Sequence, residues 1–194
     1  MTSSTQPPSA APGIPFDSTF GATSAPARSL AVMAHALAGS PQPDAGLQGL
    51  AAAMAERFGY RLFTVLILDR TAGLSRRYFS SHPEAYPPGG AKPIREDSDF
   101  FSRVVQEGQA RICADRAACE RAFPDHELIR SLGCESAVNV PVRWNGQTIA
   151  SLNLLHQAGW YRPAMLAELD WYGALAIPVV QNILQTFHQQ GEQP

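Results

Sequence analysis

The side chains best suited to binding chemistry lie in one segment that ends at Pro93, directly after the chain's single lysine. Arg76 and Tyr78 belong to a strand-like run, and Tyr86 and Lys92 follow in a loop with four prolines and two consecutive glycines. Guanidinium and ammonium groups bind carboxylates and phosphates, and exposed glycine N–H groups favour anions. The segment therefore predicts a site for a small planar or anionic molecule, with Arg76, Tyr78, Tyr86 and Lys92 as ligand-binding residues.

The alternation of side chains along this strand decides which arginine faces the site. Successive residues point to opposite faces, so Arg76 and Tyr78 share one face while Arg77 and Phe79 occupy the other. We expect one arginine to enter a pocket and the other to face solvent. Arg77 replaces Arg76 if the register shifts by one residue. The alternative is a surface loop that its prolines make stiff.

Two asparagines interrupt apolar strands near the C-terminal third of the chain. Asn139 and Asn153 lie in runs where an unpaired amide is costly to bury. Pairing across a two-residue turn sets Asn139 opposite Leu152 and Asn153 opposite Val138, so the two amides point to opposite faces. At most one of them then lines a pocket, and the alternative role is a hydrogen-bonded amide within the core.

The three cysteines match no recognisable metal or redox motif. Cys113, Cys119 and Cys134 have spacings that fit no zinc pattern, and an odd number makes no disulfide framework. Small buried thiols are the simplest interpretation. No phosphate-binding loop, dinucleotide fingerprint or Ser/His/Asp order is present. The sequence therefore specifies no cofactor.

Composition and charge describe an ordinary globular chain. The 194 residues are 45% hydrophobic and 16% charged, with a formal net charge of -2. This balance gives no case for nucleic-acid binding, and no run reaches the roughly 18 apolar residues of a membrane span. Without a signal-peptide layout, we expect a cytoplasmic location. Residues 1–27, rich in Ser, Thr, Ala and Pro, are predicted to be a disordered tail.

Hydrophobic periodicity predicts helices at both ends and strands between them. A helix over 28–39 and a second one capped by Asp44 precede the first strand, and an apolar helix beginning at Pro163 closes the chain. Pro178 should kink this last helix. The predicted strands are Arg61–Asp69, Leu74–Ser80, Ala110–Cys113, Ala137–Trp144 and Gln147–His156, with an irregular loop at 81–96 and helical turns over Asp99–Gln106 and within Asp115–Leu132.

Asn145-Gly146 between two apolar runs is a strong hairpin signal, because a type I′ turn requires positive φ at both positions. With Val-Pro-Val before the turn and Gly133 upstream of the first strand, this stretch resembles a GAF domain. The resemblance covers about 44–188 of a single domain at 28–190. It implies an α+β fold whose central antiparallel sheet carries the terminal helices on one face, with loops and short helices over the ligand face.

The resemblance also implies a function. We expect a stand-alone sensory module that binds a metabolite, with Phe101, Asn139 and Asn153 added to the candidate ligand-binding residues. The apolar helices Leu30–Leu37 and Leu166–Phe187 predict a homodimer that signals through a separate partner, because GAF domains commonly pair through such helices. One GAF-fold group, the free methionine-(R)-sulfoxide reductases, carries three cysteines in this region, which leaves a thiol reductase as an alternative. A scaffold whose pocket is filled by its own aromatic side chains is another.

Overall fold

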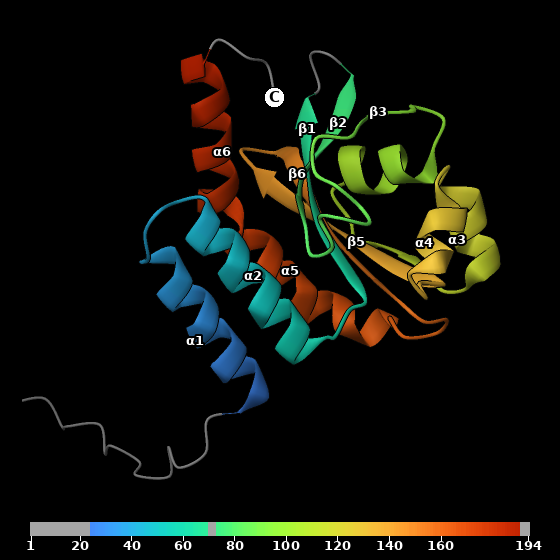
Figure 1. Cartoon of the computed structure of the whole chain (residues 1–194), viewed down its shortest axis with the longest axis horizontal. Coiled ribbons are helices and arrows are strands. Elements are labelled where there is room, and N and C mark those ends of the chain that lie inside the picture. Colours follow the sequence, from blue (N-terminus) through green and yellow to red (C-terminus); the bar gives the residue numbers. More distant parts are fainter. Residues whose placement is uncertain (1–23, 70–72, 191–194) are drawn as a thin grey trace, which may run out of the picture.

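The computed structural model describes residues 24–69 and 73–190 (Figure 1). Helix α1 (Ala25–Leu37) carries Pro26 in its first turn, a position where the missing N–H of proline costs no hydrogen bond. The predicted tail therefore extends too far, because residues 25–27 belong to this helix. The rest of that prediction, at 1–23, lies outside the described residues.

The centre of the molecule is a six-stranded sheet with the order β3-β2-β1-β6-β5-β4. All neighbouring strands are antiparallel, as predicted. The short strand β3 lies within the segment predicted as an irregular loop. The strands are β1 (Leu62–Asp69), β2 (Leu74–Ser80), β3 (Ala91–Pro93), β4 (Arg111–Cys113), β5 (Ser136–Trp144) and β6 (Gln147–His156).

Four helices from the two ends of the chain cover one face of the sheet (Figure 1). They are α1, α2 (Asp44–Arg57), α5 (Leu166–Leu175) and α6 (Ile177–Gln190). Asp44 is the first residue of α2 and makes no side-chain cap, contrary to the prediction. The predicted C-terminal helix is divided, since α6 starts one residue before Pro178, which cannot continue the hydrogen bonds of α5.

One side of the segment Leu166–Phe187, predicted to take part in a dimer, packs within the chain itself. Leu169, Ala176, Val180 and Ile183 all belong to the main core, beneath the sheet. Gly173 lets α5 approach β5 closely, because an added Cβ would lie 2.7 Å from the carbonyl oxygen of Pro141. Within the described ranges, no helix combines the length and apolar character needed to cross a bilayer.

The opposite face of the sheet is covered by shorter elements (Figure 1). They are the π-helical segment η1 (Phe100–Gln106), α3 (Arg116–Ala122) and α4 (His126–Ser131), together with the loop that contains β3. A single 3-10 turn, η2 (Pro163–Met165), precedes α5. Apolar residues of α3, α4 and the adjoining strand ends form a second, smaller core on this side. The arrangement agrees with the predicted layering.

Two irregularities in strand pairing change which side chains share a face. The hairpin turn forms as predicted, with positive φ at Asn145 and Gly146 and Trp144 paired with Gln147. A register shift between Val142 and Arg143 then moves the pairing by one residue. As a result, the predicted pairing of Asn139 with Leu152 is wrong: Asn139 lies opposite Asn153, and both amides point to the same face.

A second register shift lies between β1 and β2, at Val65/Leu66. Phe79 pairs with Val65 and Arg77 with Leu66, so Tyr78 is the extra residue of a bulge. The alternation of faces therefore fails between Tyr78 and Phe79, two neighbours that lie on the same face of the sheet. Tyr78 packs edge-on against Phe187 of α6, on the helix-covered face.

Candidate functional site

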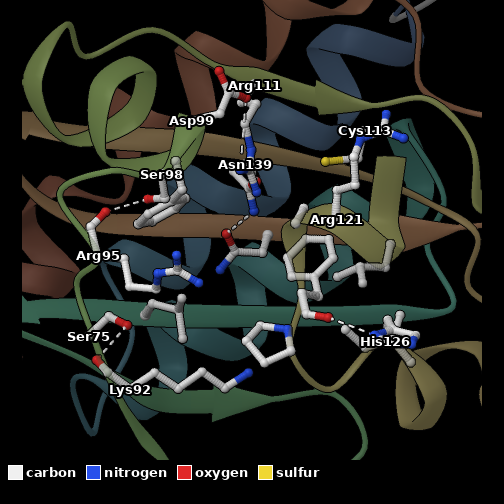
Figure 2. A pocket seen from close by; sticks show the side chains of 18 of the residues that line it. Ser75, Lys92, Arg95, Ser98, Asp99, Arg111, Cys113, Arg121, His126 and Asn139 are labelled. Atoms are coloured by element: carbon white, nitrogen blue, oxygen red, sulfur yellow. Dashed lines mark hydrogen bonds and ion pairs between the residues drawn. The ribbon is translucent and has the colours of Figure 1, made fainter. Parts of the chain in front are cut away.

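A cavity of about 1040 Å³ lies between the sheet and the short elements that cover it (Figure 2). Strands β1, β5 and β6 provide its floor. The loop around β3, the start of η1, and the segment from α3 to α4 provide its walls. Residues lining it include Thr64, Leu66, Ser75, Arg77, Tyr86, Lys92, Ile94, Arg95, Asp99, Phe100, Arg111, Cys113, Arg121, Phe123, His126, Ile129, Asn139, Asn153 and Leu155.

The floor holds a continuous chain of buried hydrogen bonds. Arg111 Nε donates to Asn139 Oδ1 at 3.0 Å, and Asn139 Nδ2 donates to Asn153 Oδ1 at 2.6 Å. The Ser151 hydroxyl donates to that same oxygen at 2.7 Å, and Asn153 Nδ2 donates to Thr64 Oγ1 at 3.3 Å. Each buried amide therefore has partners on both its oxygen and its nitrogen, as burial requires. Figure 2 shows Arg111 directly beside Asn139.

Arg111 is a buried cation with little negative charge around it. The residue is 3% exposed. In the described part of the chain its ion-pair partner is Asp99, whose carboxylate lies 3.9 Å away and is itself 63% exposed. The guanidinium carbon lies 5.5 Å from the Phe100 ring centre and 5.7 Å from that of Phe123. The aromatic rings hold the guanidinium by cation–π attraction but do not neutralise it.

A second group of charged side chains surrounds Asp125 at the far side of the cavity. Lys92 Nζ lies 2.7 Å from Asp125 Oδ2, the Tyr86 hydroxyl donates to the same oxygen at 2.6 Å, and Arg77 Nη2 lies 3.9 Å from it. The Arg77 guanidinium carbon stacks 3.5 Å from the Tyr86 ring centre, and Arg77 Nη1 donates to the carbonyl oxygen of Pro87 at 2.7 Å. Two cations thus share one carboxylate.

Ionisation in this group follows from burial and its contacts. Burial opposes charge on Asp125, yet hydrogen bonds from Lys92 and Tyr86 hold the pKa of this carboxyl below its ordinary value. Burial and the hydrogen bond to Asp125 raise the pKa of Tyr86, so the phenol stays protonated as a donor. At neutral pH the group of Arg77, Lys92 and Asp125 carries a net positive charge.

The cysteines differ in their access to the cavity. All three are free and buried, but Cys113 lines the cavity. A hydrogen bond with Cys119 lowers the pKa of the Cys113 thiol to about 7; burial opposes this shift and Arg111 adds to it. Burial raises the pKa of Cys134 to about 11. Cys113 is therefore the thiol whose environment favours the thiolate.

The structure brings together four of the seven predicted site residues. Tyr86, Lys92, Asn139 and Asn153 all line the cavity. The other three do not.

Arg76 and Tyr78 share one face, as predicted, but it is the helix-covered face, and Arg77, the stated alternative, lies on the cavity side. The bulge changes the alternation only after Tyr78, so Phe79, predicted to share the face of Arg77, packs on the helix-covered face instead. Phe101 is half-buried outside the lining, and its neighbour Phe100 takes the position expected of it.

Sequence reasoning missed Arg111 and the role of Asp125. An arginine flanked by Ala110 and Ile112 in a short predicted strand was the available signal for a buried cation. Nothing in the sequence connected Asp125 to Lys92, since they are 33 positions apart and meet only through folding. Among residues 24–69 and 73–190, no cluster of three or more His, Cys, Asp or Glu side chains is placed to hold a metal ion.

Comparison with known families and structures gives one consistent result. The family model described as GAF domain matches residues 42–179. A comparison with functionally curated proteins finds no match.

Among solved structures, the chain is similar to the GAF domain of an Acinetobacter phosphoenolpyruvate-protein phosphotransferase. That pair has 15% identity and a TM-score of 0.68, and the similarity covers 88% of this chain and 99% of that one.

Two further structures have the same fold. One is the GAF domain of a two-component sensor histidine kinase from Bacillus halodurans, with 12% identity, a TM-score of 0.61, and coverage of 76% of this chain and 99% of that one. The other is the free methionine-R-sulfoxide reductase from Neisseria meningitidis in complex with its substrate. It has 19% identity and a TM-score of 0.59, and the similarity covers 86% of this chain and 96% of that one. At these identities the similarity concerns the fold alone.

Proposed function

Because the chain belongs to the GAF domain family, we propose that it is a sensory or regulatory domain that binds a small anionic metabolite in the cavity above its sheet. GAF domains are generally sensory or regulatory modules that respond to small molecules. The open cavity of about 1040 Å³ favours ligand binding over a scaffold with a self-filled pocket.

The observation that carries the proposal is the charge on Arg111. A buried cation is costly unless it is paired, and the carboxylate of Asp99 is too distant and too exposed to pair it fully. Asn139 fixes the guanidinium through Nε, which orients the remaining N–H groups of Arg111. A carboxylate or phosphate in the cavity would complete this arrangement, since a guanidinium binds such groups through two parallel hydrogen bonds.

Native mass spectrometry of the freshly purified protein, compared with its denatured mass, tests this function. We expect an excess mass that disappears on denaturation and corresponds to an anionic metabolite. Arg111→Met removes the charge at similar volume and should abolish the excess mass. Arg103→Met, which changes an exposed arginine of η1 away from the cavity lining, is the matched control and should retain it.

Two outcomes contradict the proposal. One is an Arg111→Met variant that retains the ligand of the unmodified protein. The other is an empty protein whose melting temperature no anionic metabolite raises, because a ligand that binds only the native state must stabilise it.

We also propose that the domain forms a homodimer through its terminal helices and passes its signal to a separate partner. Support comes from Val32 of α1, 38% exposed, and Trp171 of α5, 51% exposed, since large apolar side chains on a surface favour contacts. Size-exclusion chromatography with light scattering should show a dimer that Trp171→Ser weakens. Trp144→Ser, at an equally exposed tryptophan on the hairpin, is the control and should leave the dimer intact. A strict monomer contradicts this proposal.

A thiol reductase is the second candidate, and a specific observation favours it. The Cys113 thiol lines the cavity, and its interaction with Cys119 lowers its pKa to about 7; the fold is shared with a sulfoxide reductase. In such a reaction two thiols and a sulfoxide give a disulfide, a sulfide and water, with Cys113 as the nucleophile and Cys119 as the resolving thiol. Cys113→Ser should abolish reduction of a small sulfoxide in dithiothreitol, whereas Cys134→Ser should preserve it. Equal activity of both variants contradicts this role.

A further inference from the structure

We infer that the ligand carries two anionic groups separated by a neutral segment, one bound by Arg111 and the other by Arg77 and Lys92. This inference rests on the proposed function and specifies its ligand class. Its basis is that the cavity has unneutralised positive charge at two separate places, and that the residues of β1, β5 and β6 that form the floor between them are uncharged.

The second positive place is independent of Arg111. Arg77 and Lys92 share the single carboxylate of Asp125, so one positive charge remains in excess. Arg77 is 8% exposed, and its Nε has no hydrogen-bond partner. A buried N–H without a partner costs free energy that an acceptor from a ligand would recover. Lys92 is less enclosed, with 41% of its side chain exposed, so its ammonium is accessible from the cavity.

The other charged groups on the cavity wall largely neutralise one another. Asp97 and Glu120 each form an ion pair. Arg95 Nη2 lies 2.8 Å from Asp97 Oδ2, and Arg116 Nε lies 2.7 Å from Glu120 Oε1. Asp99 is the carboxylate nearest to Arg111. Arg121 adds a further positive charge at the rim rather than a negative one. The remaining acidic side chains therefore do not cancel the excess charge at either place.

The floor between the two places offers few free polar groups. The side-chain amides of Asn139 and Asn153 are already hydrogen-bonded to Arg111, to each other, and to Ser151 and Thr64. Leu66 and Leu155 lie on the same floor, and Phe123 faces it from the wall. This surface suits an uncharged or apolar segment of the ligand. A polar segment would lose its hydrogen bonds to water and gain few from the floor in return.

The sheet order sets the separation of the two places. Arg111 is on β4 and Arg77 on β2, with β5, β6 and β1 between them. Four strand spacings of about 4.8 Å separate the two backbones by about 19 Å. Long arginine and lysine side chains reach inward from both ends and shorten that gap. A ligand several bonds long therefore fits both cations, whereas a compact anion such as sulfate contacts one.

A series of linear dicarboxylates of about four to about ten carbons, each compared with its monomethyl ester, tests the inference by titration calorimetry. We expect the best dicarboxylate to bind at least about tenfold more tightly than its ester, because the ester loses one charge-assisted contact. Lys92→Met should remove this preference, and Lys92→Arg should restore it. Arg111→Met should weaken diacid and ester alike.

The single lysine provides a direct second readout. Reductive ¹³C-methylation labels Lys92 and the terminal amine, and preserves the positive charge. The Lys92 methyl resonance should shift with the diacid and stay in place with the ester.

The outcomes separate this inference from the proposed function. Equal binding of diacid and ester, with binding of both lost in Arg111→Met, overturns the two-anion ligand and leaves the anion sensor standing. A co-purified ligand with a single anionic group does the same. If no acid binds and Arg111→Met changes nothing in the native mass, both are overturned.

Discussion

The two faces of the sheet differ in how completely they are filled. On the helix-covered face, side chains from all four terminal helices pack against β1, β5 and β6 in one apolar core. On the other face, the same strands present Thr64, Asn139 and Asn153 to a cavity covered by short elements and loops. One face stabilises the fold. The other buries polar groups that are costly unless they are hydrogen-bonded, and the contacts among Arg111, Asn139, Asn153 and Thr64 provide those bonds.

The bulges connect this difference to the backbone. If β5 and β6 paired without their register shift, one asparagine would point into the helix-covered core. The shift instead gathers both amides beneath the cavity. The bulge in β2 similarly separates Arg77, on the cavity side, from Phe79, on the helix-covered face. Local irregularity in the strands therefore separates the polar face from the apolar one.

The largest expected effect follows removal of an aromatic side chain from the filled face. Phe63 is fully buried, with Tyr60 and Phe79 rings 5.5 Å and 5.9 Å away. Phe63→Ala should lower the free energy of unfolding by about 3–5 kcal/mol, because it leaves a cavity that the core cannot fill. Urea denaturation measures this value. A loss below about 1 kcal/mol would show that this face is not the more tightly packed one.

A smaller effect is expected where α5 meets β5. In Gly173→Ala the new methyl would lie 2.7 Å from the backbone oxygen of Pro141, which cannot move without shifting the strand. We expect a loss of about 1–3 kcal/mol in urea denaturation. Ala174→Ser, at the next and exposed position, is the control and should change stability by less than about 0.5 kcal/mol. Equal values for both variants would contradict the close contact.

On the cavity face, a change of similar size should affect binding as well as stability. Asn139→Ala removes the acceptor of Arg111 and the donor to Asn153 Oδ1. We expect a loss of about 1–3 kcal/mol, the cost of leaving buried polar groups unpaired. Unlike Phe63→Ala, this variant should also lose the bound anion in native mass spectrometry, because Arg111 is no longer oriented. Retained binding would indicate that the asparagine is only structural.

The smallest effect is a pH dependence at the cavity wall. The pKa of Cys113 is lowered to about 7 from an ordinary 9.0. Alkylation of Cys113 by iodoacetamide should therefore rise through about pH 7, whereas Cys134, with a pKa raised to about 11, should stay unreactive below pH 9. Peptide mass spectrometry of each thiol measures both rates.

The lowered pKa of Cys113 also predicts how the free energy of unfolding depends on pH. A folded pKa below the unfolded one adds stability that is fully present above about pH 9 and lost as the pH falls through about 7. Cys113→Ser should remove both the neutral-pH alkylation and this part of the pH dependence. Alkylation of Cys113 that begins only near pH 9 would show that the thiol is not activated.

Most of the fold could be predicted from local patterns. The Asn145-Gly146 turn, the apolar strands around it and the helical periodicity at both ends depend on neighbours in sequence, and the structure confirms them. Strand β3 was missed because its three residues, including a proline, have no strand pattern of their own; they pair only because β2 lies beside them. The division of the last helix at Pro178 was anticipated as a kink.

The candidate site could be predicted only in part. As with β3, the missing part depends on segments that are distant in sequence and meet only in the folded chain. Sequence by itself determined the elements, the polar residues within apolar strands and the cluster of cations near Lys92. Tertiary structure decided that Arg77 rather than Arg76 faces the cavity, that Asn139 meets Asn153, and that Arg111 is buried without a close carboxylate. Propensity and periodicity act over a few residues, whereas a strand's register, and so the face on which each side chain lies, is set by the whole sheet.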